Sequence, residues 1–353
     1  MTADAPTDAP TDAAEPTGAP PATEAAARRT EPGGGPFHAG DRVQLTDPKG
    51  KPHTITLSPG RQYFTHRGSV DHDELIGRPE GSLVTSTGGT PYVALRPLLE
   101  DYVLGMPRGA AVVYPKDAAQ VIAFADVFPG ATVLEAGAGS GALSCFLLRA
   151  VGDTGRVLSV ERREDFAAVA AKNVATFFGR EHPAWELVVG DLVEVVEAGG
   201  TGEVDRVVLD MLAPWECVAA VAGVLRPGGV LIAYVATTTQ LSRVVEELRE
   251  HGGFTEPKPW ESTVRTWHVE GLAVRPDHRM IGHTGFLVTA RRLAPGVSAP
   301  PRRRRPVSAG SVDAGAGIGG AGVPDAAAGD GSARADPGVE TAGPPEPAPV
   351  VPG

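Results

Sequence analysis

Apolar and polar positions follow two different patterns along the chain, and the pattern changes near residue 105. The segments 41–57 (DRVQLTDPKGKPHTITL) and 81–95 (GSLVTSTGGTPYVAL) each hold two short apolar runs around a Gly-containing turn. Such spacing is typical of β-hairpins. The segment 97–109 (PLLEDYVLGMPRG) then predicts a connecting helix that ends at Gly-Met-Pro. We therefore expect a small β domain with a connecting helix over residues 36–105.

From residue 106 onward, strand-like apolar runs alternate with helical segments. The helical segments are 141–152, 163–179 and 237–253, and each ends at or near a glycine. The predicted strands are 131–136 (ATVLEA), 155–161 (GRVLSVE), 185–191 (WELVVGD), 205–210 (DRVVLD) and 228–236 (GGVLIAYVA). Strands that alternate with helices predict an α/β domain, with helices on both faces of a parallel sheet, over residues 106–293.

Two late segments break this alternation. Residues 263–276 (TVRTWHVEGLAVRP) and 284–292 (TGFLVTARR) read as long strands with no helix between them. Parallel neighbours need a crossover, so strands without one favour antiparallel pairing. We expect these two segments to form an antiparallel pair at the edge of the sheet.

The two ends of the chain have a different composition. Residues 1–35 are rich in Ala, Pro, Thr and acids, and residues 294–353 hold PPRRRRP followed by Gly, Ala, Pro and Asp. Neither segment has enough apolar residues to offset the entropy lost on folding. Both are predicted to be disordered tails, which leaves residues 36–293 as a folded part with a substantial core.

The charge balance restricts the kind of partner. The formal net charge is −11, of which the first tail carries −4 and the last tail −1, so about −6 remains for residues 36–293. A general nucleic-acid binder would present a basic face to phosphates. Any RNA site must therefore be a local basic patch or one assembled across subunits.

The sequence lacks the signals of several other kinds of site and cellular location. Cys145 and Cys217 lie in apolar, helical surroundings with no CxxC and no zinc spacing, which predicts two buried free thiols and no metal. The chain starts without a signal peptide and has no apolar run long enough for a membrane span. These features predict a cytoplasmic protein.

A glycine loop follows the first predicted strand of the α/β domain. Gly137, Gly139 and Gly141 form a GxGxG pattern in 133–144 (VLEAGAGSGALS). Glycines permit a tight turn and let a ligand approach the backbone. Dinucleotides, flavins and S-adenosylmethionine all use such loops, and helix–strand packing alone is another explanation.

Four acids, one near the end of each of four predicted strands, restrict the kind of ligand that the site can bind. Glu135, Glu161, Asp191 and Asp210 lie at or near the carboxyl ends of successive predicted strands, where open α/β sheets bind ligands. Glu161, 20 residues after Gly141, can accept hydrogen bonds from both ribose hydroxyls of a nucleoside. A carboxylate-rich pocket suits a cationic sulfonium better than a pyrophosphate, so S-adenosylmethionine is favoured over NAD. Any one of these acids could instead cap a helix.

Four segments together resemble a known family, the TrmI-type tRNA (adenine-N1)-methyltransferases that modify adenosine 58 in the T-loop. They are 112–117 (VVYPKD), 134–144 (LEAGAGSGALS), 209–215 (LDMLAPW) and 275–287 (RPDHRMIGHTGFL). The glycine loop is common to many methyltransferases, whereas the first and last segments are more specific. The resemblance covers about residues 36–293 and implies a small β domain, a Rossmann-like catalytic domain and a homotetramer.

The resemblance also implies site residues. It places Tyr114 and Asp210 nearest the target base. Its S-adenosylmethionine contacts would come from the acids and the loop, with Phe166 and Leu192 as further positions: Glu135, Gly137, Gly139, Ser140, Gly141, Ala142, Leu143, Glu161, Phe166, Asp191, Leu192 and Asp210. Trp215 and Trp267 are further candidates for stacking, and Arg275, Arg279, Lys116, Arg61 and Arg67 for phosphate contacts.

The chemistry of adenine N1 gives Asp210 a specific task. N1 has an in-plane lone pair and needs no deprotonation, so catalysis is mainly alignment. A carboxylate that accepts a hydrogen bond from the N6 amino group would stabilise the positive charge that develops on adenine. The alternative role for Asp210 is to cap the helix predicted to begin near Trp215. The alternative functions are a noncatalytic tRNA-binding subunit and a methyltransferase for a small molecule or protein.

Overall fold

The computed structural model describes residues 35–299. The two predicted tails lie outside these residues, apart from Gly35 and residues 294–299. Within residues 35–299, no helix is both long enough and apolar enough to cross a membrane.

The first part of the described chain is a small β region with its own core. A four-stranded antiparallel sheet has the order β2-β1-β6-β5, and a separate hairpin pairs β3 with β4. Phe37, Leu45 and Leu75 are fully buried in its core. The strands are β1 (Arg42–Thr46), β2 (Pro52–Thr56), β3 (Gln62–Thr65), β4 (Gly68–Asp71), β5 (Ser82–Thr85) and β6 (Pro91–Leu95). Both predicted hairpins are present, and the division of the chain at residue 105 stays a prediction.

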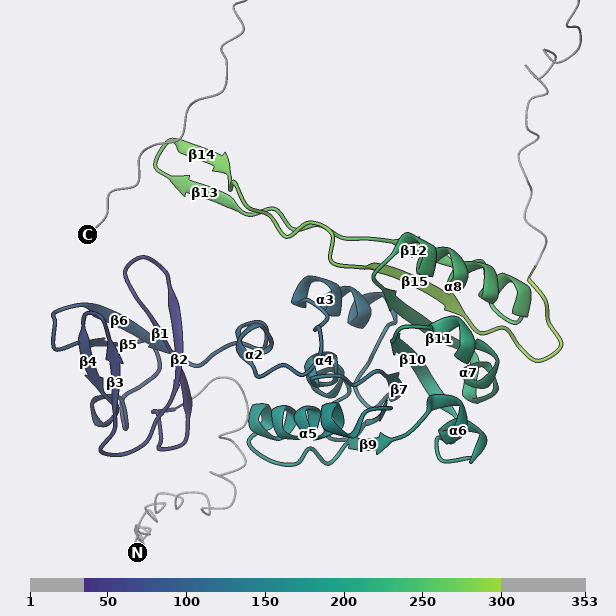
Figure 1. Ribbon diagram of the computed structural model, residues 1–353, viewed down its shortest axis with the longest axis horizontal. Coiled ribbons are helices and arrows are strands. Elements are labelled where there is room, and N and C mark those ends of the chain that lie inside the picture. The colour runs from purple at the N-terminus through teal and green to yellow at the C-terminus, as the bar shows by residue number, and fades with distance from the viewer. Residues whose placement is uncertain (1–34, 300–353) are drawn as a thin grey trace, which may run out of the picture. The chain divides into compact units, whose positions relative to one another are not determined.

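The second part is a seven-stranded sheet with the order β12-β15-β11-β10-β7-β8-β9 (Figure 1). Strands β9, β8, β7, β10 and β11 pair in parallel, whereas β15 is antiparallel to both of its neighbours. The strands are β7 (Thr132–Ala136), β8 (Arg156–Glu161), β9 (Trp185–Val189), β10 (Val204–Asp210), β11 (Leu225–Val235), β12 (Lys258–Trp260) and β15 (Phe286–Arg291). The mixed α/β architecture is the one predicted.

Helices cover both faces of this sheet. One core cluster includes residues of α2, α3, α4 and α5, and the other includes residues of α6, α7 and α8. The helices are α2 (Leu99–Gly105), α3 (Pro115–Phe124), α4 (Ala142–Val151), α5 (Glu164–Phe178), α6 (Leu192–Glu197), α7 (Val218–Val224) and α8 (Thr238–His251). Because both faces are covered, the central strands are apolar on both sides, as in the fully buried Val207 and Leu231.

The strand order reverses between β7 and β10. From β7 the chain proceeds through β8 to β9 on one side, and then returns to place β10 and β11 on the other side. Such a switch point leaves a crevice beyond the carboxyl ends of the two strands, where ligands bind in open α/β sheets. The glycine loop after β7 and Asp210 at the end of β10 both lie at this crevice.

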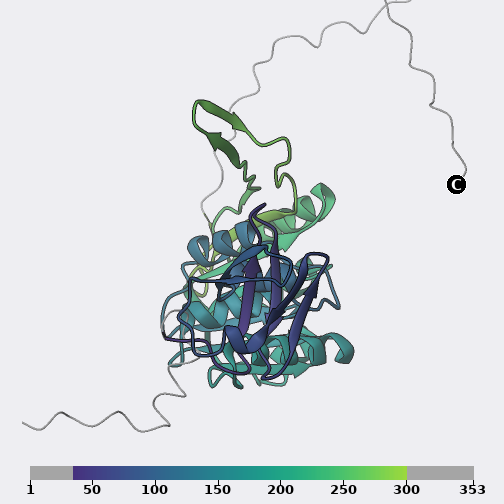
Figure 2. The ribbon, with the colours of Figure 1, turned by 90° about the vertical axis from the view of Figure 1, so that its left-hand side faces the viewer.

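The prediction for residues 263–276 is wrong. This segment forms two strands, β13 (Trp267–Glu270) and β14 (Ala273–Pro276), which pair with each other and with no strand of the large sheet (Figure 2). The edge strand beside β15 is instead β12, a three-residue strand that is hard to recognise in the sequence because it contains Pro259. Most side chains of β13 and β14 are exposed, so an apolar run is here no sign of burial.

Candidate cofactor and active site

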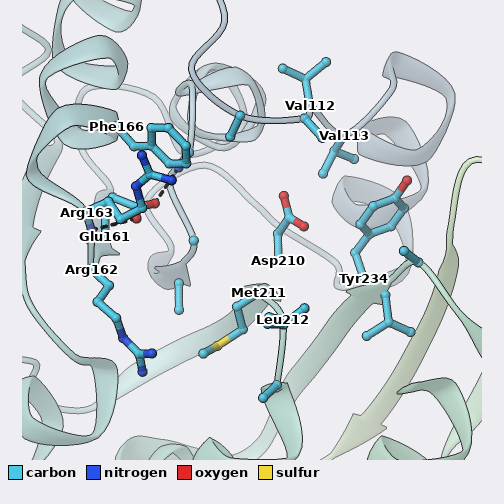
Figure 3. A pocket seen from close by; sticks show the side chains of 18 of the residues that line it. Val112, Val113, Glu161, Arg162, Arg163, Phe166, Asp210, Met211, Leu212 and Tyr234 are labelled. Atoms are coloured by element: carbon cyan, nitrogen blue, oxygen red, sulfur yellow. Dashed lines mark hydrogen bonds between the residues drawn. The ribbon is translucent and has the colours of Figure 1, made fainter. Parts of the chain in front are cut away.

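A cavity of about 1030 Å³ opens at the carboxyl ends of the parallel strands. Seven of the predicted site residues line it: Tyr114, Gly137, Gly139, Glu161, Phe166, Leu192 and Asp210. They come from five separate places in the sequence, so the fold brings together what the pattern could only place at strand ends. Figure 3 shows the Asp210 carboxyl pointing into this cavity, between Glu161 and Tyr234.

The glycine loop packs directly on the end of β10. A Cβ atom built on Gly137 would lie 1.8 Å from the carbonyl oxygen of Asp210, and Gly137 has a φ of +85°. Only glycine satisfies both the left-handed backbone and this contact. The loop therefore reaches Asp210 because residue 137 has no side chain.

Glu161 shapes the loop as well as lining the cavity. Its Oε2 accepts a hydrogen bond from the backbone N–H of Gly139 at 2.8 Å, and its Oε1 accepts one from the N–H of Arg163 at 3.0 Å (Figure 3). A carboxylate has further lone pairs, so both oxygens can still accept hydrogen bonds from a ligand. The Arg163 guanidinium lies 3.7 Å from the ring centroid of Phe166, which also lines the cavity.

Glu135 lies below the loop and does not line the cavity. It is fully buried, and its Oε2 accepts hydrogen bonds from Ser144 Oγ at 2.6 Å and from Ser159 Oγ. Among the described residues, Oε1 of Glu135 has no hydrogen-bond partner. The pKa of Glu135 is raised to about 7, mainly by burial and in smaller part by the charge of Glu161, against the hydrogen bonds from the two serines, which lower it. This acid is thus readily protonated unless a cation lies nearby.

The pKa of Asp210 is raised as well. This pKa is raised to about 7, mainly by burial and in smaller part by the nearby carboxylates of Glu135 and Glu161. It is not a helix cap, because the 3₁₀ turn Pro214–Cys217 begins after Ala213 with no side-chain cap. Strand register places Asp210 beside Tyr234 of β11.

Asp191 does act as a helix cap. Its Oδ1 accepts the N–H of Val193 at 2.8 Å at the start of α6, and its Oδ2 pairs with Arg162 at 2.5 Å. The hydrogen bond from Arg162 lowers the pKa of Asp191 and keeps it charged. Asp191 does not line the cavity, although Gly190, Leu192 and Arg162 do. Its contact with a cofactor stays a prediction.

The rest of the predicted loop contributes backbone and support. Ser140 is buried, and its Oγ accepts hydrogen bonds from the N–H groups of Gly109 and Ala110, both at 3.1 Å. Gly141 precedes α4, and Ala142 and Leu143 form the buried first turn of that helix. Direct cofactor contacts from these four residues remain predictions.

Ten further lining residues are not among the predicted site residues, although six of them lie in segments that carry the family resemblance. They are Ala110, Val112, Val113, Arg162, Met211, Leu212, Tyr234, Gln240, His283 and Thr284. Tyr234 could have been found, since it lies at the carboxyl end of a predicted strand, as the four acids do. Its hydroxyl donates a hydrogen bond to the carbonyl oxygen of Thr284 at 2.8 Å, and burial raises its pKa to about 12.

Other candidates are not in the cavity. Lys116 is buried in an ion pair with Asp117, so the expectation of a phosphate contact is wrong. Trp215 packs on the core with the Arg243 guanidinium 4.0 Å from its ring centroid, and Trp267 lies on β13. Cys145 and Cys217 are buried free thiols, as predicted. No cluster of His, Cys, Asp or Glu within residues 35–299 is arranged to hold a metal ion.

The arrangement suits a cationic nucleoside. Gly137 and Gly139 line the cavity with bare backbone, and Glu161 borders the same space. The orphaned Glu135 Oε1 and the raised pKa values of two acids mark a cluster that a positive charge would stabilise. Together with the sheet order, this site defines the class of S-adenosylmethionine-dependent methyltransferase folds.

Comparisons with known proteins identify the family within this class. The family model described as TrmI-like N-terminal matches residues 35–84, and the model described as tRNA methyltransferase complex GCD14 subunit matches residues 92–276. The tRNA (adenine(58)-N(1))-methyltransferase TrmI of Thermus thermophilus is 37% identical over 248 residues, which cover 70% of this chain and 95% of that protein. The chain therefore belongs to the TrmI family of tRNA methyltransferases.

Of two similar solved structures, the first agrees with the methyltransferase class and the second with the TrmI family. A S-adenosylmethionine-dependent O-methyltransferase from Thermotoga maritima matches with a TM-score of 0.68 and 29% identity, covering 76% of this chain and 96% of that one. The tRNA (m1A58) methyltransferase TrmI from Aquifex aeolicus matches with a TM-score of 0.64 and 26% identity, covering 73% of this chain and 99% of that one.

Proposed function

We propose that this protein uses S-adenosylmethionine to methylate N1 of adenosine 58 in the T-loop of tRNA. The observation that supports this most directly is the Asp210 carboxyl, which points into a cavity shared with the glycine loop and is not used as a helix cap. The names of the relatives specify the same reaction for those proteins. A tRNA substrate agrees with the cytoplasmic location that the sequence predicts.

The cofactor would occupy the side of the cavity bounded by the loop. Glu161, which lines the cavity, would accept hydrogen bonds from the ribose hydroxyls, and Phe166 and Leu192 would supply apolar walls. Asp191, held in its charged form by Arg162, would accept a hydrogen bond from the adenine amino group. When bound, S-adenosylmethionine supplies an electrophilic methyl group on a sulfonium. The acids Glu135 and Asp210 favour that positive charge.

The target adenine would enter on the side of Tyr114 and Tyr234. Its base must leave the folded RNA before it can reach the cavity. Tyr114 would hold the base by stacking, while the Asp210 carboxylate accepts a hydrogen bond from N6. This contact orients N1 and stabilises the positive charge that the ring gains. Guanine has an oxygen at this position and cannot donate, so the same contact selects adenine.

Tyr114→Ala should raise KM for tRNA, because the variant lacks the ring on which the base would stack. Unchanged steady-state kinetics would contradict this role of Tyr114.

We also propose that the chain assembles as a homotetramer. Four apolar side chains of the β13–β14 hairpin are largely exposed, among them Val269 at 68% and Leu272 at 104%. A hairpin that presents apolar side chains without a sheet to cover them favours an intermolecular contact. Arg275 of β14 and Arg279, three residues after the end of that strand, are candidates for contacts with the RNA phosphates.

The test of the proposed function is methyl transfer to an unmodified tRNA transcript. The purified chain is incubated with S-adenosylmethionine labelled on its methyl group, and label in RNA is measured. A matched transcript with guanosine in place of adenosine 58 is the control. Label should enter the first transcript and not the second. No label in either, from a folded protein that binds the cofactor, would contradict the proposal.

A further inference from the structure

A buried ion pair lies next to the side of the cavity where the base would enter. Lys116 Nζ and Asp117 Oδ1 are 2.7 Å apart, and their side chains are 6% and 0% exposed. Both residues belong to the first turn of α3, directly after Tyr114, whose backbone forms the start of that helix. Burying two charges costs several kcal/mol per ion before they attract each other, so such a pair is weak evidence for stability.

The pair binds both ends of one chain segment. Lys116 Nζ donates to the carbonyl oxygen of Ser262 at 2.8 Å and to Thr284 Oγ1 at 2.6 Å. Asp117 accepts hydrogen bonds from Ser262 Oγ at 3.0 Å and from Thr284 Oγ1 at 2.5 Å. The 21 residues between Ser262 and Thr284 include the β13–β14 hairpin. Every polar group of the pair is therefore used to hold the base of this segment.

The same contacts reach residues that line the cavity. Thr284 lines it, and its carbonyl oxygen accepts the hydroxyl of Tyr234. Tyr234 neighbours Asp210 in the sheet, and Tyr114 precedes the ion pair by two residues. His283 also lines the cavity, with one ring nitrogen 2.9 Å from Glu261 Oε2 and the other 3.2 Å from the carbonyl oxygen of Ala236. Helix α3, strand β11 and the hairpin segment thus meet at one network.

We propose that Lys116 and Asp117 are positioning residues for methyl transfer, which fix Tyr114, Tyr234 and Thr284 around Asp210. Neither charged group lines the cavity, so the pair acts through these neighbours. Transfer requires the base nitrogen, the methyl carbon and the sulfur to lie in line, and small displacements of the positioning groups cost rate. The inference rests on the proposed function, because it concerns the base-binding side of that same site.

The test compares three variants with the wild-type chain for kcat, KM for tRNA, cofactor affinity and Tm. They are Lys116→Met, Asp117→Asn and the double variant Lys116→Met/Asp117→Leu. A single variant leaves one buried charge unpaired and should also lower Tm, whereas replacing both charges by apolar groups is often neutral for stability. The double variant should recover Tm and bind the cofactor within about twofold, yet its kcat should fall by about 30-fold or more.

A control separates positioning from general destabilisation. Arg206 is also buried, pairs with Asp126 at 3.0 Å, and lies outside the cavity lining. Arg206→Met should lower Tm while kcat stays within about twofold of wild type, measured below the unfolding range. If the single variants fail to fold, the double variant and Ser262→Ala, which removes one hydroxyl from the network, still give kcat.

The outcomes separate this inference from the proposed function. A wild-type chain that transfers no methyl group to tRNA contradicts the proposed function. An active wild-type chain whose double variant keeps kcat within about threefold contradicts the positioning role alone. A double variant that loses cofactor affinity and Tm in parallel with kcat also contradicts it, because the pair would then be a general stabiliser of the fold.

Discussion

At the scale of single residues, the site depends on where each carboxylate lies relative to the cavity. The strand pattern places four acids near strand ends but does not show which of them bind a ligand. An acid that caps a helix and an acid that contacts a ligand can both follow directly after a strand. The structure separates them: Asp191 caps α6, Glu135 is buried under the loop, and Glu161 and Asp210 face the cavity. The spacing of these acids along the sequence does not predict these different surroundings.

Replacing Asp210 should affect turnover far more than RNA binding. Asp210→Ala removes the acceptor for N6 and should lower kcat by about 100-fold or more, the size typical for a lost electrostatic contact in a transition state. The affinity for tRNA, measured by filter binding, should change little, since RNA affinity comes mainly from phosphates. Asp210→Asn keeps the shape and an acceptor oxygen, so it should lose less. Turnover within a few-fold of wild type for Asp210→Ala would reject the role.

Cofactor binding should depend on pH near neutrality. The pKa values of Glu135 and Asp210 are raised to about 7, so below pH 7 these acids are mostly neutral and above it mostly charged. A cationic cofactor prefers the charged forms, so its affinity should rise from pH 6 to pH 8 and binding at pH 7 should release protons. Calorimetry in buffers of different ionisation enthalpy measures the release. Identical binding heats in all buffers would mean that no protons are released, which would contradict the raised pKa values.

The same two acids should make the fold less stable as the pH rises from about 4 to 7. Their pKa values are higher in the folded chain than in the unfolded chain, so the folded state holds more protons in this window. Stability falls with pH wherever the native state binds more protons. Bound cofactor should cancel this loss, because it favours the deprotonated forms.

At the scale of helices and strands, prediction succeeded where burial and periodicity agree. The parallel strands are continuous apolar runs, and the long helices end at Gly152, Gly179 and Gly252, all with positive φ. It failed at β12, which is three residues long, and at β13 and β14, whose apolar side chains are exposed. An apolar run in the sequence therefore predicts burial only where another element of the same chain packs over it.

The contact of the glycine loop with β10 gives a test at this scale. Gly137→Ala places a Cβ atom 1.8 Å from the carbonyl oxygen of Asp210 in a backbone conformation that disfavours side chains. It should lower stability by at least about 2 kcal/mol and abolish cofactor binding. Gly152→Ala is the matched control: its φ is +67°, but nothing lies within 4 Å of the added Cβ. Equal losses of Tm in the two variants would show that the clash with β10 is unimportant.

At the scale of the whole molecule, the exposed hairpin connects the fold to assembly. Apolar surface on β13 and β14 favours association of chains, and the proposed homotetramer should appear in light scattering on the purified chain as the mass of four chains. The double variant Val269→Glu/Leu272→Glu should reduce the mass, because carboxylates buried without a partner at an apolar interface are costly. Val297→Glu, at another exposed apolar residue, should leave it unchanged. A monomeric wild-type chain at micromolar concentration would contradict the assembly.

Methylation of N1 of adenosine 58 in tRNA is the reaction that we propose for this protein. Its most direct test is to react unmodified tRNA with the protein and S-adenosylmethionine, digest the RNA to nucleosides, and identify the product by mass spectrometry, with primer extension to locate it. We expect 1-methyladenosine at position 58, formed by the wild-type protein and strongly reduced with Asp210→Ala. A methyl group on another nucleoside, on another atom of adenosine, or on no nucleoside at all would contradict it.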